Sequence, residues 1–308
     1  MQSITGRVFM SFLRFVFHSP LNDSTKLSDN AAKITKKKES NYKPSKEFTH
    51  TRHKCGQAHY EVLKSIKSKS DKVILLIHGG GFKVELIDYY RKLAEKYSRL
   101  FDGATIVNAD YRTWPSCELP NQMYDTVGVY LELLSKGIKS ENITVIGDSA
   151  GATLALTSAL WLRDNNYTLP GHTVCFSLWG DATSSGESKI KNAYTDPFYG
   201  ISKKEKIEDN MHLLRRISKY VQNADREDPY ISPCFGEFHG FNKVTLFCGT
   251  AELDESDNDR VYMKMKQSDV DVRLFKYEGM CHCFQMFSFL PESKDAFNKM
   301  VKRDKGEI

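Results

Sequence analysis

The sequence predicts an α/β protein whose central sheet is mostly parallel and flanked by helices. Apolar runs recur along the chain, and each has the continuous texture of a strand that is buried on both faces. Segments with helical spacing of apolar residues separate these runs, which is the alternation that a parallel sheet requires. The runs are residues 73–77, 104–109, 143–146, 174–179 and 244–248.

The length and composition agree with this prediction. The chain has 308 residues, of which 40% are hydrophobic and 27% are charged, as in a globular protein with ample material for a core. The net charge of +5 is mild and no stretch alternates basic and aromatic residues, so we expect no nucleic acid partner. Seven cysteines, an odd number of which several lie in apolar runs, favour a reducing compartment, and we expect a cytoplasmic protein.

The N-terminal 70 residues differ in texture from the rest. We expect a helix over about residues 5–18, then a polar stretch interpreted as a mobile flap, then a short strand near residues 58–62. The run from Lys36 to Lys38 lies in the polar stretch and is interpreted as a solvated loop. Residues 1–70 are therefore taken as a cap or flap segment with the first strand.

The aromatic run over residues 5–18 admits two interpretations. It is too short to span a bilayer, Arg14 interrupts it, and it lacks the features of a signal peptide. The first interpretation is an amphipathic helix that packs on the protein. The alternative is a helix that makes a weak contact with a membrane surface.

From residue 71 onward, strand and helix signals alternate until residue 181. Residues 182–225 are polar and helix-prone, chiefly over 203–220, without the texture of a buried strand, so we interpret them as a cap insertion. The core then resumes over residues 226–308 and adds a strand at 272–275. The helices of the core are expected near residues 86–97, 124–136, 150–163, 258–268 and 296–302.

A Gly-x-Ser-x-Gly turn at residues 147–151 joins an apolar run to a helix-prone run. This order predicts a strand-to-helix elbow that lifts Ser149 clear of the sheet as a nucleophile. A serine hydroxyl is a weak nucleophile alone, so the elbow requires a base, an acid and an anion-binding pocket elsewhere. Three glycines at residues 79–81 follow a buried strand, and their amides together with that of Ala150 are suited to stabilise an oxyanion.

The base and the acid are expected on loops at the carboxyl edge of the sheet. Among nine histidines, His282 lies on a loop after a predicted strand, whereas His78 is interpreted as structural. The loop after residues 244–248 holds several acids, of which we place Asp254 first and leave Asp257 and Glu252 as alternatives. The cysteines on both sides of His282 lack a second Cys/His pair at ligand spacing, so no metal site is predicted, and the chemistry calls for no cofactor.

Taken in order, these motifs resemble the hormone-sensitive-lipase-like branch of the α/β-hydrolases. The matching pieces are His-Gly-Gly-Gly-Phe at residues 78–82, Asp-Tyr-Arg at 110–112, Gly-Asp-Ser-Ala-Gly at 147–151 and the Gly-Met-x-His-x-Phe loop at 279–284. The resemblance implies an α/β-hydrolase fold with a helical cap, made from the N-terminal segment and the insertion. It also implies a Ser149–Asp254–His282 triad and an oxyanion hole formed by Gly80, Gly81 and Ala150. Two departures are Asp254-Glu255-Ser256-Asp257 in place of Asp-Pro-Leu-x-Asp, and the cysteines beside His282.

The predicted function is that of a serine carboxylesterase acting on small esters with short- to medium-chain acyl groups through an acyl-enzyme on Ser149. One alternative is a deacetylase or amidase that acts on a small acylated metabolite or sugar. An alternative of another class is a non-catalytic small-molecule receptor on the same fold. A homodimer is expected by analogy with the family.

Overall fold

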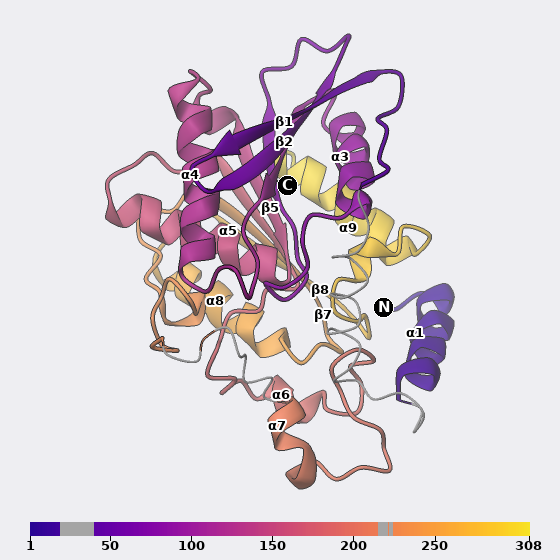
Figure 1. Ribbon diagram of the computed structural model, residues 1–308. Coiled ribbons are helices and arrows are strands. Elements are labelled where there is room, and N and C mark those ends of the chain that lie inside the picture. The colour runs from indigo at the N-terminus through magenta and orange to yellow at the C-terminus, as the bar shows by residue number, and fades with distance from the viewer. Residues whose placement is uncertain (19–39, 215–220, 222–223) are drawn as a thin grey trace.

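The computed structural model describes residues 1–18, 40–214, 221 and 224–308, and an eight-stranded sheet organises them (Figure 1). The strand order is β1-β2-β4-β3-β5-β6-β7-β8; β3 to β8 run parallel, and β1 and β2 run antiparallel to their neighbours. The predicted α/β fold with a mostly parallel sheet is thus confirmed. The strands are β1 Phe48–Cys55, β2 Ala58–Ser65, β3 Val73–Ile77, β4 Thr105–Asp110, β5 Ile143–Asp148, β6 His172–Phe176, β7 Lys243–Gly249 and β8 Val272–Tyr277.

Helices cover both faces of the sheet and explain why its central strands are apolar on both sides (Figure 1). One face carries α4 (Asn121–Ser135), α5 (Ala150–Asp164) and α8 (Glu255–Gln267), and the other carries α3 (Asp88–Leu100) and α9 (Pro291–Asp304) with α1 (Ile4–Phe17) outside them. The remaining helical turns are short: η1 Ser140–Asn142, α6 Ser188–Lys191, η2 Glu208–Asn210, α7 Met211–Leu214, η4 Pro233–Phe235 and η5 Phe284–Met286.

The N-terminal strands form a hairpin that the sequence analysis recognised only in part. Strand β2 was expected, but β1 was missed. Residues 49–54 lack the alternating apolar side chains that indicate a strand, and they are largely exposed. Strand β1 forms through its pairing with β2 along all eight of its residues, and Gly56 turns between them with φ 57°. Backbone pairing, rather than side-chain burial, therefore holds this edge strand.

The described part of the insertion contains less helix than expected. Within residues 203–220, the described part forms only η2 and α7; residues 215–220 lie outside the described residues. The expected flap and the Lys36–Lys38 run lie mostly or wholly in residues 19–39, which are also outside them. The first residue of the insertion contacts the segment that follows the insertion: the Ala182 N–H donates to Ser232 Oγ at 2.8 Å.

The last helix is tied to the amino edge of the sheet by one buried carboxylate. Asp304, whose side chain is 8% exposed, accepts hydrogen bonds from Thr144 Oγ1 at 2.6 Å and His172 Nδ1 at 3.0 Å, and lies 2.8 Å from Lys72 Nζ. Burial alone would raise the pKa of Asp304, but the bonds from His172, Lys72 and Thr144 hold this pKa well below its usual range. Thr144 of β5, His172 of β6 and Lys72, which directly precedes β3, thus meet at the Asp304 side chain.

We expect Asp304→Asn to lower the free energy of unfolding at neutral pH by roughly 3 kcal/mol, because it leaves the Lys72 charge without its partner. A carboxyl with a depressed folded pKa contributes stability above its unfolded pKa of about 3.9, and this is lost as the pH falls through the folded pKa. In urea unfolding, the difference from wild type should be constant down to about pH 5 and shrink below about pH 4. Asp102→Asn, at a carboxylate that is 75% exposed, is the control and should change little. An equal loss in both variants would contradict the role of Asp304.

Candidate active site

Ser149 lies at the turn between β5 and α5, in a backbone conformation that few side chains adopt. Its φ is 54° and its ψ is −122°, which is the strained geometry of a nucleophile elbow. The flanking glycines are required by close packing: a Cβ on Gly147 would collide with the Gly151 backbone, and one on Gly151 would collide with the Ile77 carbonyl oxygen. The turn is therefore pressed against the end of β3, where the glycine loop begins.

His282 contacts Ser149 from the loop that follows β8. Its Nε2 lies 2.8 Å from Ser149 Oγ, and its Nδ1 lies 3.1 Å from Glu252 Oε2. With Nδ1–H donating to the carboxylate, Nε2 is left free to accept the serine proton. The structure therefore brings Ser149, His282 and a carboxylate into one chain of hydrogen bonds.

The carboxylate in this chain is not the one that the sequence analysis placed first. Asp254 Oδ2 is 3.6 Å from His282 Nδ1, beyond hydrogen-bond length, whereas Glu252 makes the bond. The other alternative, Asp257, accepts the Gly180 N–H at 3.0 Å and has no described bond to His282. Glu252 and Asp254 thus both face the imidazole, but only Glu252 is bonded to it.

A buried cation from the insertion accounts for the position of Asp254. Lys189, on α6, is 2% exposed; its Nζ forms an ion pair with Asp254 Oδ1 and lies 3.5 Å from Asp257. A buried ammonium needs counter-charges at close range, and these two aspartates supply them. Asp254 is therefore shared between Lys189 and His282, whereas Glu252 has no cation other than the histidine as a described partner.

Glu252 is held by polar groups on each of its oxygens. Ser177 Oγ donates to its Oε1 at 2.8 Å and the Gly249 N–H donates to the same oxygen, which leaves Oε2 for His282. Burial raises the pKa of Glu252, while the contacts with His282, Gly249 and Ser177 favour the ionised form. The carboxylate is thus fully hydrogen-bonded in its charged state.

The sequence analysis gave no indication of the role of Ser177, nor of the contacts by which the insertion holds the acid loop, the loop after β7 that carries Glu252 and Asp254. Asn192 Nδ2 donates to the Glu252 carbonyl oxygen at 2.6 Å, and the Leu253 N–H donates to Asp196 Oδ2 at 2.9 Å. No short-range pattern marks Asn192 and Asp196, since they lie about 60 positions from the loop that they support. Their polar side chains in a segment without a core pattern are the one signal that they carry.

The glycine loop is tied to the elbow by a tyrosine that the sequence analysis also missed. Tyr90 Oη accepts the Gly79 N–H at 2.9 Å and donates to Asp148 Oδ2 at 2.8 Å. Burial raises the pKa of Asp148 to about 6. His78 lies beneath this loop, wholly buried and stacked on Tyr111 at 4.2 Å, and burial lowers its pKa to about 4, in keeping with a structural role.

The amides that were expected to form the oxyanion hole carry unused donors. No acceptor among the described residues takes a hydrogen bond from the N–H of Gly80, Gly81 or Ala150. Gly80 and Gly81 have φ of 110° and 60°, conformations that favour glycine. Ala150 begins α5, so its N–H lies at the positive end of that helix. These three donors are free to bind an oxygen that carries negative charge.

A model of the family described as alpha/beta hydrolase fold matches residues 74–286 of the chain, which include every residue of the bonded site. The chain belongs to this family. The α/β-hydrolase fold and family that the resemblance implies are confirmed, as is the enzyme class: the protein is an esterase-like hydrolase.

Two relatives and one solved structure illustrate the similarity of this hydrolase to known proteins. It is 29% identical over 232 residues to an esterase of Acinetobacter venetianus, covering 75% of this chain and 73% of that protein. It is 28% identical over 228 residues to an acetyl-hydrolase of Streptomyces hygroscopicus, covering 73% and 72%. The structure of a hormone-sensitive lipase from a metagenome library matches with a TM-score of 0.82 and 21% identity over 99% of both chains, a likeness of fold.

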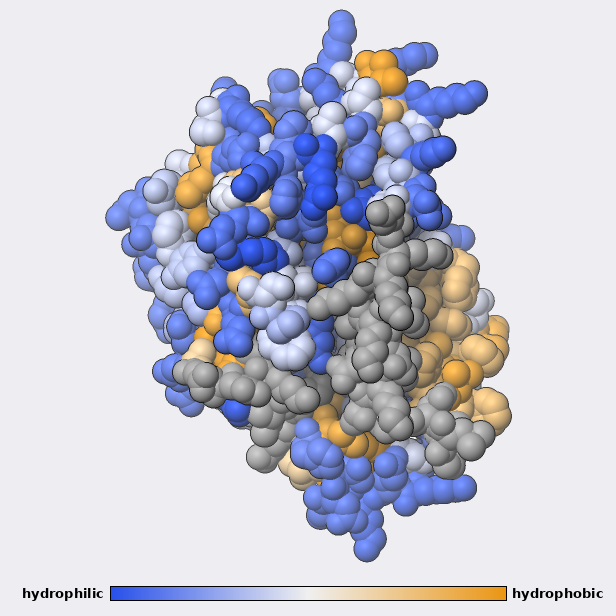
Figure 2. Space-filling model, in the orientation of Figure 1, coloured by the Kyte–Doolittle hydropathy of each residue, from blue (hydrophilic) through white to orange (hydrophobic). Residues whose placement is uncertain are grey.

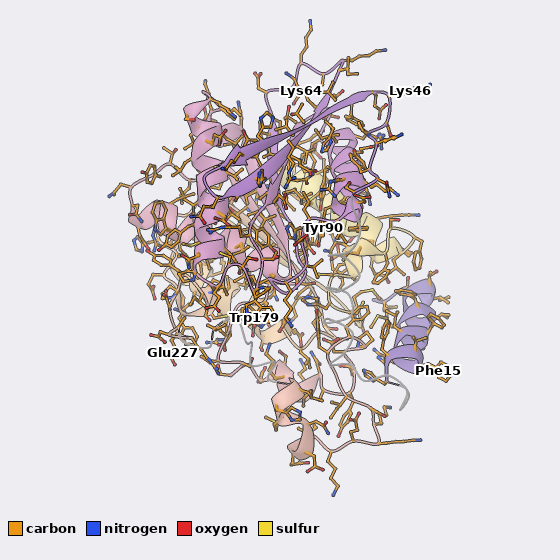
Figure 3. The ribbon with its side chains drawn as sticks, in the orientation of Figure 1. Phe15, Lys46, Lys64, Tyr90, Trp179 and Glu227 are labelled. Atoms are coloured by element: carbon orange, nitrogen blue, oxygen red, sulfur yellow. The ribbon has the colours of Figure 1, made fainter. Side chains whose placement is uncertain are left out.

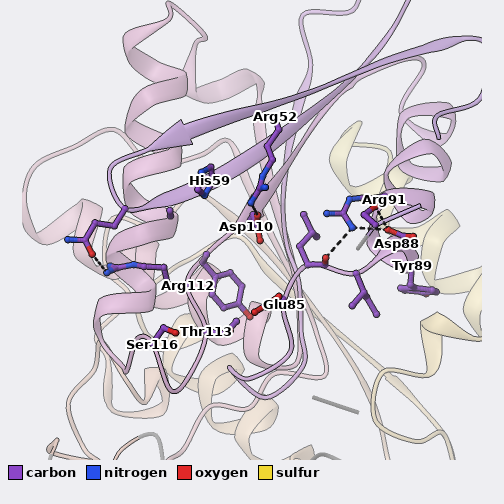
Figure 4. A pocket seen from close by; sticks show the side chains of 16 residues that line it. Arg52, His59, Glu85, Asp88, Tyr89, Arg91, Asp110, Arg112, Thr113 and Ser116 are labelled. Carbon is purple, nitrogen blue, oxygen red and sulfur yellow. Dashed lines mark hydrogen bonds and ion pairs between the residues drawn. The ribbon is translucent and has the colours of Figure 1, made fainter. Parts of the chain in front are cut away.

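The hydrolase has a cavity of about 790 Å³ beside the glycine loop, lined by residues of β1, β2, the start of α3 and the loop after β4 (Figure 4). Two ion pairs lie in its lining: Arg52 lies 2.7 Å from Asp110, and Arg91 lies 2.8 Å from Asp88. Neither Ser149 nor any residue of its bonded chain lines this cavity. The cavity is therefore separate from the nucleophile, and we assign no chemistry to it.

The environment of His282 predicts the pH dependence of this hydrolase. Burial lowers the pKa of His282, but its hydrogen bond to Glu252 raises it, and the net change is well upward from the ordinary value of about 6.5. Burial raises the pKa of Cys283 to about 11, so its thiol is neutral and the carboxylates supply the charge that favours imidazolium. A general base must be neutral to accept a proton, so activity should increase with pH through this pKa.

We therefore expect kcat/KM to rise with pH along a limb whose midpoint lies above about 6.5. In Glu252→Gln the limb should move to lower pH, because removal of the carboxylate lowers the pKa of His282. Initial rates with a soluble p-nitrophenyl ester from pH 5 to 9 measure both curves. A midpoint at or below the ordinary histidine value in the wild-type enzyme would contradict this assignment.

Proposed function

We propose that the protein is a serine esterase that hydrolyses carboxylic esters with short- to medium-chain acyl groups through an acyl-enzyme on Ser149. The observation that carries the proposal is the continuous hydrogen-bonded chain from Ser149 through His282 to Glu252. A serine that is bonded to a neutral imidazole, itself oriented by a carboxylate, is the arrangement that activates a hydroxyl for attack on an acyl carbon.

In the proposed mechanism, Ser149 Oγ attacks the ester carbonyl carbon while His282 Nε2 takes its proton. The negative charge on the former carbonyl oxygen is stabilised by the N–H groups of Gly80, Gly81 and Ala150. The alcohol leaves with the proton from His282. A water molecule then attacks the acyl carbon while His282 takes a proton from it. His282 gives this proton to Ser149 Oγ as the bond between the acyl carbon and Oγ breaks, which releases the carboxylic acid and restores the free enzyme.

We propose Glu252 as the orienting acid of this reaction, in place of the aspartate that the family resemblance implies. Its bond to His282 Nδ1, and the commitment of Asp254 to Lys189, support this choice. Asp254 remains close enough to favour the imidazolium electrostatically, as a second negative charge. Glu252 alone holds the ring in the tautomer that the mechanism requires.

The proposal of an acyl substrate is supported by aromatic side chains near Ser149 and His282. Phe82, next to the glycine loop, makes an edge contact with Trp179 at 5.5 Å, and Thr153 of α5 donates to the Trp179 carbonyl oxygen. Tyr199 of the insertion makes an edge contact with the His282 ring at 5.2 Å. Apolar walls suit an acyl chain, and the relative from Streptomyces hygroscopicus is named an acetyl-hydrolase.

A substrate panel tests this proposal. We would measure kcat/KM for p-nitrophenyl esters from acetate to decanoate, with p-nitroacetanilide and an acetylated sugar beside them. The expected result is a maximum at a short or medium acyl chain and far slower cleavage of the amide. A higher kcat/KM for the amide or the acetylated sugar than for every ester would favour the deacetylase or amidase alternative instead.

We also propose that the insertion, residues 182–225, and the N-terminal segment form one cap. Contacts between them support this division, since Arg14 Nε donates to the Thr195 carbonyl oxygen at 2.9 Å and His18 Nε2 lies 2.8 Å from the Asp196 carbonyl oxygen. The cytoplasmic location and the homodimer stay predictions. Light scattering at rising protein concentration would test the dimer.

A further inference from the structure

Helix α1 has two apolar faces, and one of them is exposed. Its inner face packs on the protein through Met10 and Leu13, which are buried. Four large apolar side chains occupy the outer face with spacings of four, four and three residues, which places them in one stripe. These are Ile4, Val8, Phe12 and Phe15, with exposed fractions of 79%, 66%, 58% and 80%.

The stripe is contiguous with a further exposed ring, and together they form an apolar surface on one flank of the molecule (Figure 2). Phe289, 54% exposed, lies 5.0 Å from the ring of Phe9 and so borders the helix. Phe15 points away from the body of the protein (Figure 3). If a large side chain presents roughly 200 Å² when fully exposed, this surface amounts to on the order of 600 Å², the upper end of what a monomer leaves in water.

The exposure is not the result of a loosely attached helix, because contacts fix α1 at both ends. At its start, Ser3 N–H and Oγ donate to the Glu292 carboxylate at 2.6 and 3.0 Å. At its end, Arg14 binds the Thr195 carbonyl oxygen, and Phe17 makes an edge contact with Phe198 at 5.3 Å. The outer stripe is therefore held in a defined orientation.

We propose that this outer face of α1 docks on a phospholipid surface. The helix has 14 residues, about 21 Å of length, and no helix among the described residues is long and apolar enough to cross a bilayer. A helix of this kind lies in the plane of the membrane interface, with its apolar side chains among the acyl chains. The stripe of Ile4, Val8, Phe12 and Phe15 provides that contact.

Charge favours lipid over protein as the occupant. Residues 1–20 contain no Asp or Glu, and Arg7 is exposed beside the stripe, so the helix can approach anionic headgroups without repulsion. A single stripe suits a bilayer, which surrounds the exposed rings instead of matching their shape.

The inner face of the same helix packs against the loop that carries His282. Gln2 Nε2 donates to the Gly279 carbonyl oxygen at 3.3 Å, and Met10 lies in the same apolar cluster as Met280 and Cys281. Docking would therefore bring the histidine loop close to the membrane interface. The docking itself does not depend on the proposed esterase function, whereas a role in access to lipid-dissolved esters would rest on it.

Co-sedimentation of the full chain with sucrose-loaded vesicles tests the docking. We would compare phosphatidylcholine vesicles with and without phosphatidylserine, using wild type, F12S/F15S and a control, I66S/M263S, whose two side chains are also more than half exposed, at 61% and 54%, but lie outside α1. Wild type and the control should bind, more strongly with phosphatidylserine, and F12S/F15S should bind at least about tenfold more weakly. Thermal unfolding and hydrolysis of a soluble ester should be unchanged in all three, which separates this test from that of the esterase.

Two results would overturn the proposal. Wild type that stays in the supernatant, or equal vesicle binding by wild type and F12S/F15S, would show that the stripe does not dock on lipid. A dimer in light scattering that F12S/F15S dissociates, without vesicle binding by wild type, would identify a second copy of the chain as the occupant.

Discussion

Replacement of Ser149 by alanine is expected to reduce kcat for p-nitrophenyl ester hydrolysis by roughly 10⁵- to 10⁶-fold, as for other triad nucleophiles. The reason is that Ser149 Oγ is the oxygen that bonds to His282 Nε2, at 2.8 Å, so without it the acyl-enzyme cannot form. A stopped assay with highly purified protein measures the residual rate. A fluorophosphonate probe followed by mass spectrometry should label Ser149 in wild type and nothing at that site in the variant.

The control for this prediction is Ser158→Ala. Ser158 is also buried on α5, but its hydroxyl faces Thr126 Oγ1 at 2.5 Å rather than the histidine. This variant should retain kcat within a few fold and remain labelled at Ser149. Retention of more than a few per cent of kcat by Ser149→Ala would reject Ser149 as the nucleophile.

The second large effect is expected at the acid. Glu252→Gln should lower kcat by roughly 10³- to 10⁴-fold with little change in KM, because the amide no longer fixes the histidine tautomer or supports the imidazolium. Asp254→Asn should cost about tenfold, since Asp254 contributes a second charge but no hydrogen bond to His282. Steady-state kinetics for both variants at the pH optimum of each enzyme give the comparison.

Asp257→Asn is the matched control for the acid loop. Asp257 shares Lys189 with Asp254 and is wholly buried, but its bond is to the Gly180 N–H. This change should lower the melting temperature without a comparable loss of kcat in the folded protein. If Asp254→Asn loses more kcat than Glu252→Gln, Asp254 is the acid, as the family motif implies.

Lys189 allows a further check on the same choice. If it keeps Asp254 from the histidine, then neutralising it in the Glu252→Gln background should let Asp254 turn toward Nδ1 and restore part of the lost kcat. We expect K189M/E252Q to exceed E252Q by at least about tenfold in kcat, a coupling of the size seen between contacting residues. Circular dichroism establishes whether the double variant is folded. No recovery in a folded double variant would mean that Lys189 does not control Asp254.

The parts of the fold that could be predicted are those whose signal is local. Strands β3 and β5 are buried on both faces and so show as unbroken apolar runs, and the elbow shows as two glycines around Ser149. The helices of the core were found within a few residues of their observed ends. Strand β1 was missed because its side chains are largely exposed and only its backbone partners define it.

The residues of the site likewise divide into those with a local sequence signal and those without one. Ser149 and His282 could be singled out, because each lies on a loop directly after a strand, and parallel strands deliver such loops to one edge. Because both loops lie at that edge, His282 Nε2 can form its hydrogen bond of 2.8 Å with Ser149 Oγ. Which carboxylate meets His282 did not follow, since Glu252, Asp254 and Asp257 lie within about five positions of one another, on the loop after β7 and the first turn of α8.

The sequence by itself determined the α/β fold, the strained elbow at Ser149, the glycine loop and a histidine at the right edge of the sheet. Backbone geometry and burial impose residue types at those positions, so the residues reveal them. Only the tertiary structure decided which carboxylate is bonded to His282 and which face of α1 is exposed. Lys189 reaches Asp254 from 65 positions away, and α1 buries one apolar face while exposing the other. Burial and ion pairing depend on which segments meet in space, and this is a property of the whole fold rather than of any one stretch.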